Sequence, residues 1–64
     1  MSNFKERLEL ETEQLEERLS KLDDFIESEK FKTIDPFQQL MLEIQLTAMV
    51  TYYTCLEARL KQLN

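Results

Sequence analysis

The sequence predicts an all-α protein, an antiparallel two-helix hairpin that assembles into a helical-bundle homo-oligomer. None of the 64 residues is glycine, so tight β-hairpins and phosphate-cradling loops lack the residue that their turns require. Apolar residues recur at helical spacing in both halves of the chain. A chain this short can bury only a small core, and oligomerisation is a common way to stabilise one.

We expect a single helical-hairpin domain, whose first helix covers residues 3–28. Asn3 is a suitable N-cap, and Glu6 follows three residues later, as in a capping box. A seven-residue repeat of leucine, with a second core position four residues after each, indicates a helical packing seam. The seam consists of Leu8, Thr12, Leu15, Leu19, Leu22 and Ile26. The other faces are rich in glutamate, and we interpret this acidic surface as solvated.

Residues 29–35 are the expected loop between the helices. Phe31 and Ile34 alternate with polar residues there and are expected to hold the loop against the core. Asp35 and Pro36 form a strong helix start, because aspartate caps a helix and proline fits its first turn. Gln38 completes a second capping box. The second helix is therefore expected over residues 36–62.

The second helix carries apolar residues on more than one face. We expect the stripe that packs on the first helix to consist of Leu40, Ile44, Ala48, Tyr52, Leu56 and Leu60 or Leu63. The candidates for a contact between subunits are Met41, Leu46, Met49 and Tyr53. Residues 50–55 have strand propensity, but a lone strand would find no partner in this chain. Ala48 and Ala58 would let helix axes approach closely.

The composition excludes several classes of function. The net charge of −5 disfavours nucleic acids and anionic membranes as partners. No apolar run reaches the length of a membrane span, and no signal peptide is evident, so a cytoplasmic protein is expected. The chain has no histidine and a single cysteine, Cys55. We therefore expect no metal, no cofactor and no catalytic site, with Cys55 packed in the core.

Cationic, hydroxyl and aromatic side chains are the candidates for binding a small ligand. They are Arg7, Lys30, Lys32, Thr47, Thr51, Tyr52, Tyr53 and Arg59. In an antiparallel hairpin the end of the second helix lies beside the start of the first, so Arg59 is expected to approach Arg7. The alternative for the cations is a surface ion pair with glutamate. The hydroxyls could instead bond to their own helix, and the tyrosines could simply pack.

The order of residues resembles a family of very short proteins from crAss-like and other tailed phages. The specific part of the pattern is Gln45-x-x-Ala48-Met49-x-x-Tyr52-x-x-x-Leu56-x-x-Arg59. The remaining matches are Glu6, Arg7, Leu8, Glu11, Leu15, Arg18, Lys21, Leu22, Phe25, Ile26, Phe31, Ile34, Gln39 and Met41. The resemblance implies a phage origin rather than an activity.

A looser similarity, in size and hairpin form, is to the phage sponge proteins that counter CBASS and Thoeris immunity. It implies an oligomer that sequesters a cyclic nucleotide or an ADP-ribose-type signal at its subunit interfaces, without catalysis. No binding residue is implied, since the likeness lies in architecture alone. The alternative is a helical protein–protein interaction module, such as a coiled-coil adaptor or an inhibitor of a host protein.

Overall fold

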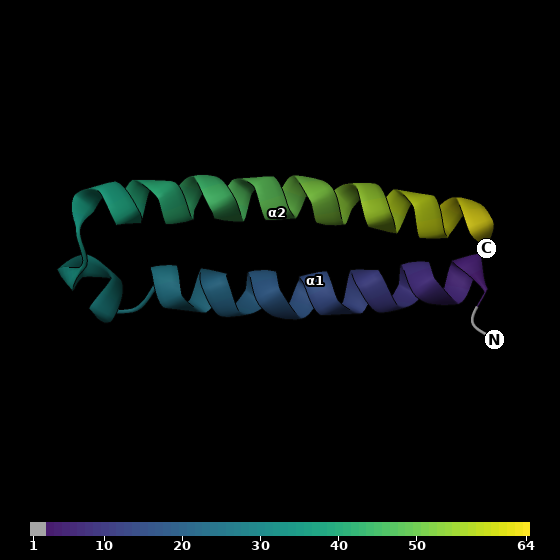
Figure 1. Cartoon of the computed structure of the whole chain (residues 1–64), viewed down its shortest axis with the longest axis horizontal. Helices are drawn as coiled ribbons and strands as arrows, with labels where there is room; N and C mark the ends of the chain where they lie inside the picture. Colours follow the sequence, from purple (N-terminus) through teal and green to yellow (C-terminus); the bar gives the residue numbers. More distant parts are fainter. Residues whose placement is uncertain (1–2) are drawn as a thin grey trace.

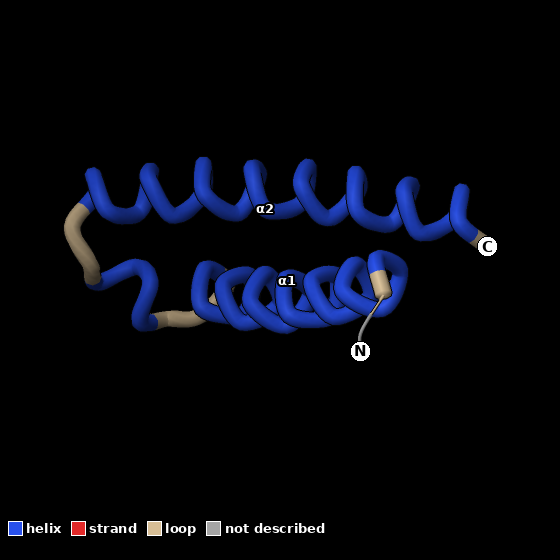
Figure 2. Tube along the Cα trace, turned by 45° about the vertical axis from the view of Figure 1, so that its right-hand side comes forward, coloured by secondary structure: helices blue, strands red, loops and turns tan. Residues whose placement is uncertain are grey.

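The computed structural model describes residues 3–64, in which two long helices run antiparallel, side by side (Figure 1). Helix α1 spans Phe4–Ile26 and helix α2 spans Pro36–Leu63. A single 3₁₀ turn, η1, spans Lys30–Thr33 and bridges the two helices (Figure 2). The principal extents are 45 × 18 × 15 Å. The all-α hairpin is therefore confirmed. We call the end with η1 the closed end and the opposite end the open end.

The helix boundaries follow from local capping interactions. The side chain of Asn3 accepts a hydrogen bond from the Glu6 amide, at 2.7 Å. Asp35 Oδ2 accepts from the amides of Phe37 and Gln38, at 2.9 and 3.3 Å. Both predicted N-caps are thus confirmed, since each satisfies amides that the first helical turn leaves free. Helix α1 ends two residues earlier than expected, and the expected loop contains η1.

The core is a narrow seam between the helices. Its buried centre consists of Leu8, Leu15 and Leu56, with Leu19, Met49, Tyr53 and Leu60 packed against it. Leu56 has no exposed surface. Thr12 is also buried, and its hydroxyl donates to the Leu8 carbonyl at 2.7 Å, which satisfies the polar group inside the seam. The leucine seam predicted for the first helix is confirmed.

The closed end has a small apolar cluster of its own. Phe31 in η1 is 7% exposed. Its ring meets that of Phe25 edge to face, with the centroids 6.0 Å apart, a preferred geometry for aromatic pairs. Ile34 is half-buried. Phe31 therefore anchors the connection as predicted.

The stripe predicted to join the second helix to the first is wrong in its first four members. Leu40 and Ile44 are each 54% exposed, Tyr52 is 45% exposed and Ala48 is exposed. A repeat of four residues advances about 40° beyond a full turn at each step, so such a stripe winds around the helix. It reaches the seam only at Leu56. The observed seam alternates steps of four and three through Leu42, Leu46, Met49, Tyr53, Leu56 and Leu60.

The correction also moves residues that were assigned to a contact between subunits. Met49 and Tyr53 pack on the hairpin core, and Leu46 is half-buried on the same seam. A second copy could reach only their exposed edges. Of the four residues assigned to a subunit contact, only Met41 lies on the outer side of α2, the side that faces away from α1. It is 36% exposed. Cys55 is exposed rather than part of the core.

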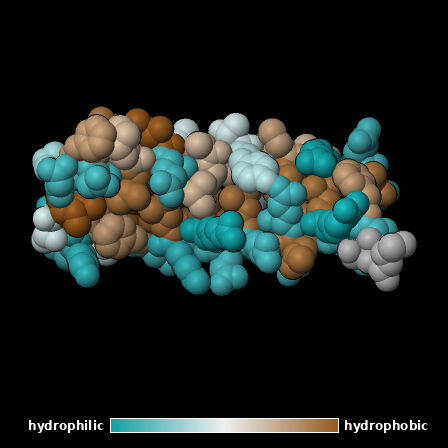
Figure 3. Space-filling view, viewed as in Figure 1, coloured by the Kyte–Doolittle hydropathy of each residue, from teal (hydrophilic) through white to brown (hydrophobic). Residues whose placement is uncertain are grey.

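The surface divides along the two helices. In Figure 3 hydrophobic side chains gather over the first half of α2 and the closed end, whereas hydrophilic side chains line the free edge of α1. The exposed large hydrophobic residues on α2 include Phe37, Leu40, Met41, Ile44, Val50 and Tyr52. Among residues 3–64 no helix is both long and apolar enough to cross a membrane.

Candidate functional site

The open end of the hairpin brings the two predicted arginines together. Arg7 in the second turn of α1 and Arg59 near the end of α2 line one hollow of about 350 Å³, together with Phe4, Leu8 and Glu11. We call it the arginine hollow. Antiparallel pairing explains its position, because the first turns of α1 lie beside the last turns of α2 (Figure 1). The expected approach of Arg59 to Arg7 is thus supported.

Phe4 supplies the aromatic wall of the arginine hollow. The guanidinium carbon of Arg59 lies 5.7 Å from the centroid of the Phe4 ring, which is within the range of a cation–π contact. The contact holds the Arg59 side chain across the two helices. Phe4 was not among the predicted site residues. Its place one turn before Arg7 was the available signal, since residues three apart share a helix face.

The charges in the arginine hollow favour an anion. Two arginines and one glutamate line it, in a chain whose net charge is −5. Phe4 is also the first residue of α1, so the positive end of that helix's dipole lies at the same place. Arginine presents a planar fork of donors that suits phosphate and carboxylate. A phosphate-bearing ligand with a planar group would find both donors and a stacking surface there.

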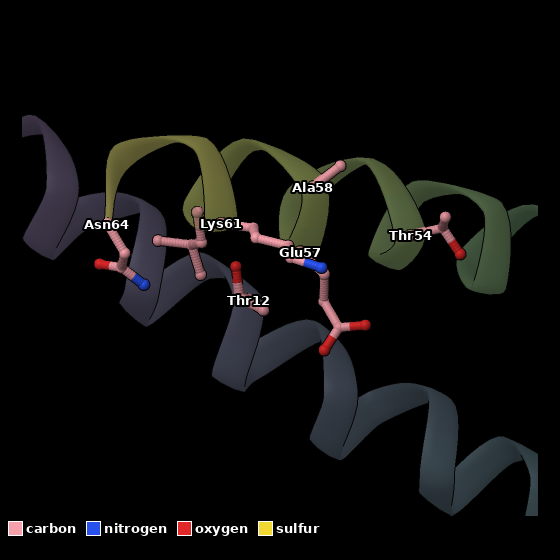
Figure 4. A pocket seen from close by; sticks show the side chains of 7 residues that line it. Thr12, Thr54, Glu57, Ala58, Lys61 and Asn64 are labelled. Carbon is pink, nitrogen blue, oxygen red and sulfur yellow. The ribbon is translucent and has the colours of Figure 1, made fainter.

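A second hollow lies at the open end and is less suited to an anion. It has a cavity volume of about 540 Å³ and is lined by Thr12, Thr54, Glu57, Ala58, Leu60, Lys61 and Asn64. Figure 4 shows Thr12 on α1 facing α2, whereas Ala58 points away from α1. One lysine and one glutamate balance their charges in this hollow. The hydroxyl of Thr12 is already committed to its own helix.

The predicted lysines lie at the closed end, far from the arginine hollow. Lys30 and Lys32 belong to η1. The Lys32 ammonium lies 2.9 Å from a carboxylate oxygen of Glu29, and both side chains are largely exposed. This is the surface ion pair considered as the alternative, and such pairs are weak. Within one hairpin, the four predicted cations therefore form two separate groups.

The two predicted threonines, Thr47 and Thr51, are exposed on α2. The hydroxyl of Thr47 donates to the Glu43 carbonyl and that of Thr51 to the Thr47 carbonyl, both at 3.1 Å. Thr54 makes the same bond to the Val50 carbonyl at 2.9 Å. Each hydroxyl proton is used within the helix, as the alternative interpretation held. The oxygens still have an acceptor site, but an anion requires donors.

Tyr53 links the two helices instead of lining an open site. Its hydroxyl lies 2.6 Å from Oε2 of Glu16 on α1 and 3.0 Å from Oε2 of Glu57 on α2. The hydrogen bond to Glu16, and then the bond to Glu57, raise the pKa of Tyr53 well above its usual range. Ionising the phenol would place a third negative charge beside two carboxylates. The same two carboxylates would repel an anionic ligand at this position. The neighbouring predicted residue, Tyr52, is exposed.

Comparison with known proteins gives two matches. A family model described as Sequestin matches residues 2–62. The chain is also 36% identical, over 62 residues, to a protein of Enterobacteria phage T4 described as an uncharacterized 7.5 kDa protein in the denB-rIIB intergenic region. That alignment covers 97% of each chain. No solved structure matches. The resemblance to short phage proteins is thus supported, while the likeness to crAss-like phage proteins and to sponges stays a prediction.

Proposed function

The chain belongs to the Sequestin family, and on that premise we propose that it is a phage accessory protein that sequesters a small ligand without altering it. The ligand is a nucleotide-derived immune signal, of the cyclic nucleotide or ADP-ribose class, held by a homo-oligomer in the host cytoplasm. The family description and the relative from phage T4 support sequestration by a phage protein. The proposed class of ligand is inferred from the residues that line the arginine hollow.

The observation that carries the ligand class is the arginine hollow. Arg7 of α1 and Arg59 of α2 both line the hollow, and the Phe4 ring lies within cation–π distance of Arg59. Phosphate groups pair with guanidinium forks, and nucleobases stack on aromatic rings and guanidinium planes. A nucleotide offers both groups in one small molecule. The hollow is open and shallow, which suits a ligand that a second subunit covers.

The residues around the hollow favour binding over catalysis. The chain contains no histidine, so it lacks the usual base of a hydrolytic dyad. Tyr53, with its pKa raised by two carboxylates, keeps its proton and cannot serve as a base at neutral pH. Cys55 is exposed and is not among the residues that line the arginine hollow. We therefore propose a stoichiometric binder.

Calorimetry with a panel of cyclic di- and trinucleotides and ADP-ribose derivatives tests the proposal. We expect one panel member to bind, and Arg59→Gln to weaken it by about ten-fold or more, because a lost charge-assisted hydrogen bond costs roughly 1.5–3 kcal/mol. The matched control is Arg18→Gln, which removes an exposed arginine of α1 outside the hollow. A panel without any complex, or equal losses in both variants, would contradict the assignment.

The alternative function is a module that binds a host or phage protein through the outer side of α2. The exposure of Phe37, Leu40 and Ile44 on that side favours it, because a contiguous apolar face attracts another helix. Ile44→Glu would then abolish co-purification with a defined protein while leaving the hairpin helical. Its matched control is Val50→Glu, on another side of α2. Retained co-purification in Ile44→Glu would eliminate this alternative.

A further inference from the structure

Helix α2 carries a second heptad seam on its outer side. It begins at Phe37 and alternates steps of four and three, through Phe37, Met41, Ile44, Ala48, Thr51 and Cys55, all of them exposed. Each member lies five residues before a member of the seam that faces α1. At 100° per residue, the two seams are roughly 140° apart around the helix. The outer seam therefore faces away from α1, as Ala58, its next member, does in Figure 4.

The outer seam has the composition of a buried surface. No member is charged, and between Pro36 and Leu56 the helix has a single charged residue, Glu43. Among residues 3–64 the hairpin's own core is small, with four buried hydrophobic residues, Leu8, Leu15, Phe31 and Leu56. Domains of this size rarely reach useful stability from one such core. A second helix on the outer seam would supply the missing burial.

We propose that a second copy of this chain covers the outer seam, with the two α2 helices packed antiparallel about a two-fold axis between Ala48 and Thr51. Full overlap of the 28-residue helix with its symmetry mate places residue 37 opposite residue 62. Met41 then faces Ala58, Ile44 faces Cys55 and Ala48 faces Thr51. Every layer of the seam combines one member from each of its two heptad positions, as an antiparallel coiled coil requires.

The sizes of the side chains select the antiparallel orientation. The outer seam begins with the large residues Phe37, Met41 and Ile44 and ends with the small residues Cys55 and Ala58. Antiparallel pairing sets Met41 against Ala58 and Ile44 against Cys55, so large residues meet small ones on both sides of the central Ala48–Thr51 layers. Parallel pairing would set large against large at one end and leave voids between small residues at the other.

The antiparallel dimer also changes the distribution of the cations. The closed end of each copy lies beside the open end of the other. Arg7 and Arg59 of one copy and Lys30 and Lys32 of the second copy then occupy the same end of the dimer. The dimer is argued from the outer seam alone, so a dimer that binds no nucleotide would still support it while the proposed function failed.

Thiol cross-linking tests the register directly. In Ile44→Cys, a short thiol-to-thiol cross-linker should join position 44 of one copy to Cys55 of the other, as mapped on the cleaved peptides. Ile44→Cys combined with Cys55→Ser is the matched control, and it should lose the cross-link. Wild-type protein should give no Cys55–Cys55 product. A 55–55 product, or a 44–44 product in the control, would establish parallel pairing and overturn the proposal.

Light scattering tests whether the outer seam holds the dimer together. The wild-type protein should have twice the chain mass of 7.7 kDa. Ala48→Glu places two carboxylates beside the two-fold axis and should reduce the mass to that of one chain. Val50→Glu makes the same change at an exposed position off the outer seam and should keep the doubled mass. A monomeric wild type, or an unchanged mass in Ala48→Glu, would overturn the proposal.

Discussion

At the scale of single residues, Tyr53 joins the two helices through a hydrogen bond as well as packing. Its ring packs on the hairpin core, while its hydroxyl reaches Glu16 across the seam and Glu57 one turn along α2. A phenol has a single proton, so the two carboxylates share one donor. The arrangement stabilises the neutral phenol and makes this contact sensitive to alkaline pH.

The raised pKa of Tyr53 predicts how the stability changes with pH. Its pKa is 10.0 in the absence of these contacts and is raised in the folded protein. The contribution is therefore complete below about pH 10 and decreases as the pH rises above that value, because the unfolded chain releases the proton first. Denaturant unfolding at a series of alkaline pH values measures this decrease. Tyr53→Phe should show a smaller decrease, and an identical profile in the variant would contradict the prediction.

At the scale of elements, the helices were predictable and the packing face of α2 was not. Asn3, Asp35 and Pro36 are local signals, and local capping chemistry depends on few neighbours. The face of α2 depends on tertiary packing, and two heptad seams of apolar residues compete on that helix. Glu43 alone is too little charge to distinguish them. On α1, by contrast, dense glutamate leaves one possible seam.

The site shows the same division between local and tertiary information. The approach of Arg59 to Arg7 follows from antiparallel topology, which the loop length and capping signals already imply. The cation–π contact with Phe4 could not be predicted without knowing how each helix is rotated about its axis. Predicting the partners of Tyr53 requires the same knowledge of helix rotation, because Glu16 is 37 residues away in the sequence.

The cap of α2 gives a prediction at this scale. Asp35→Ala removes the acceptor of two backbone amides and should reduce the free energy of unfolding by about 0.5–2 kcal/mol. Gln38→Ala is the matched control. Its side chain was expected to complete a capping box, but Gln39 is the glutamine that bonds to the chain before α2, through the Ile34 carbonyl. Chemical denaturation followed by circular dichroism should show a clear loss only in Asp35→Ala.

At the scale of the whole molecule, the hairpin resembles half of a helical bundle. Its core lies along the contact between α1 and α2 and contains few fully buried side chains, and the outer side of α2 remains apolar and exposed. Folding and association are then expected to be one coupled process, since the dimer contains the burial that the single hairpin lacks.

Coupled folding and association predict a melting temperature that depends on concentration. The Tm of the wild-type protein should rise as the protein concentration increases, because mass action favours the dimer. Calorimetric scans over a hundred-fold range of concentration measure this shift. A Tm that stays constant over that range would show that one hairpin is sufficient for stability.

The gathering of Leu8 and Leu56 in one buried cluster sets the order of events during synthesis. Both residues belong to the buried centre of the seam, yet Leu8 leaves the ribosome long before Leu56 is added to the chain. Until then α1 is a strongly acidic segment without a surface to pack on. The buried centre can form only after most of α2 has emerged, and a chain that stops before Leu56 lacks it.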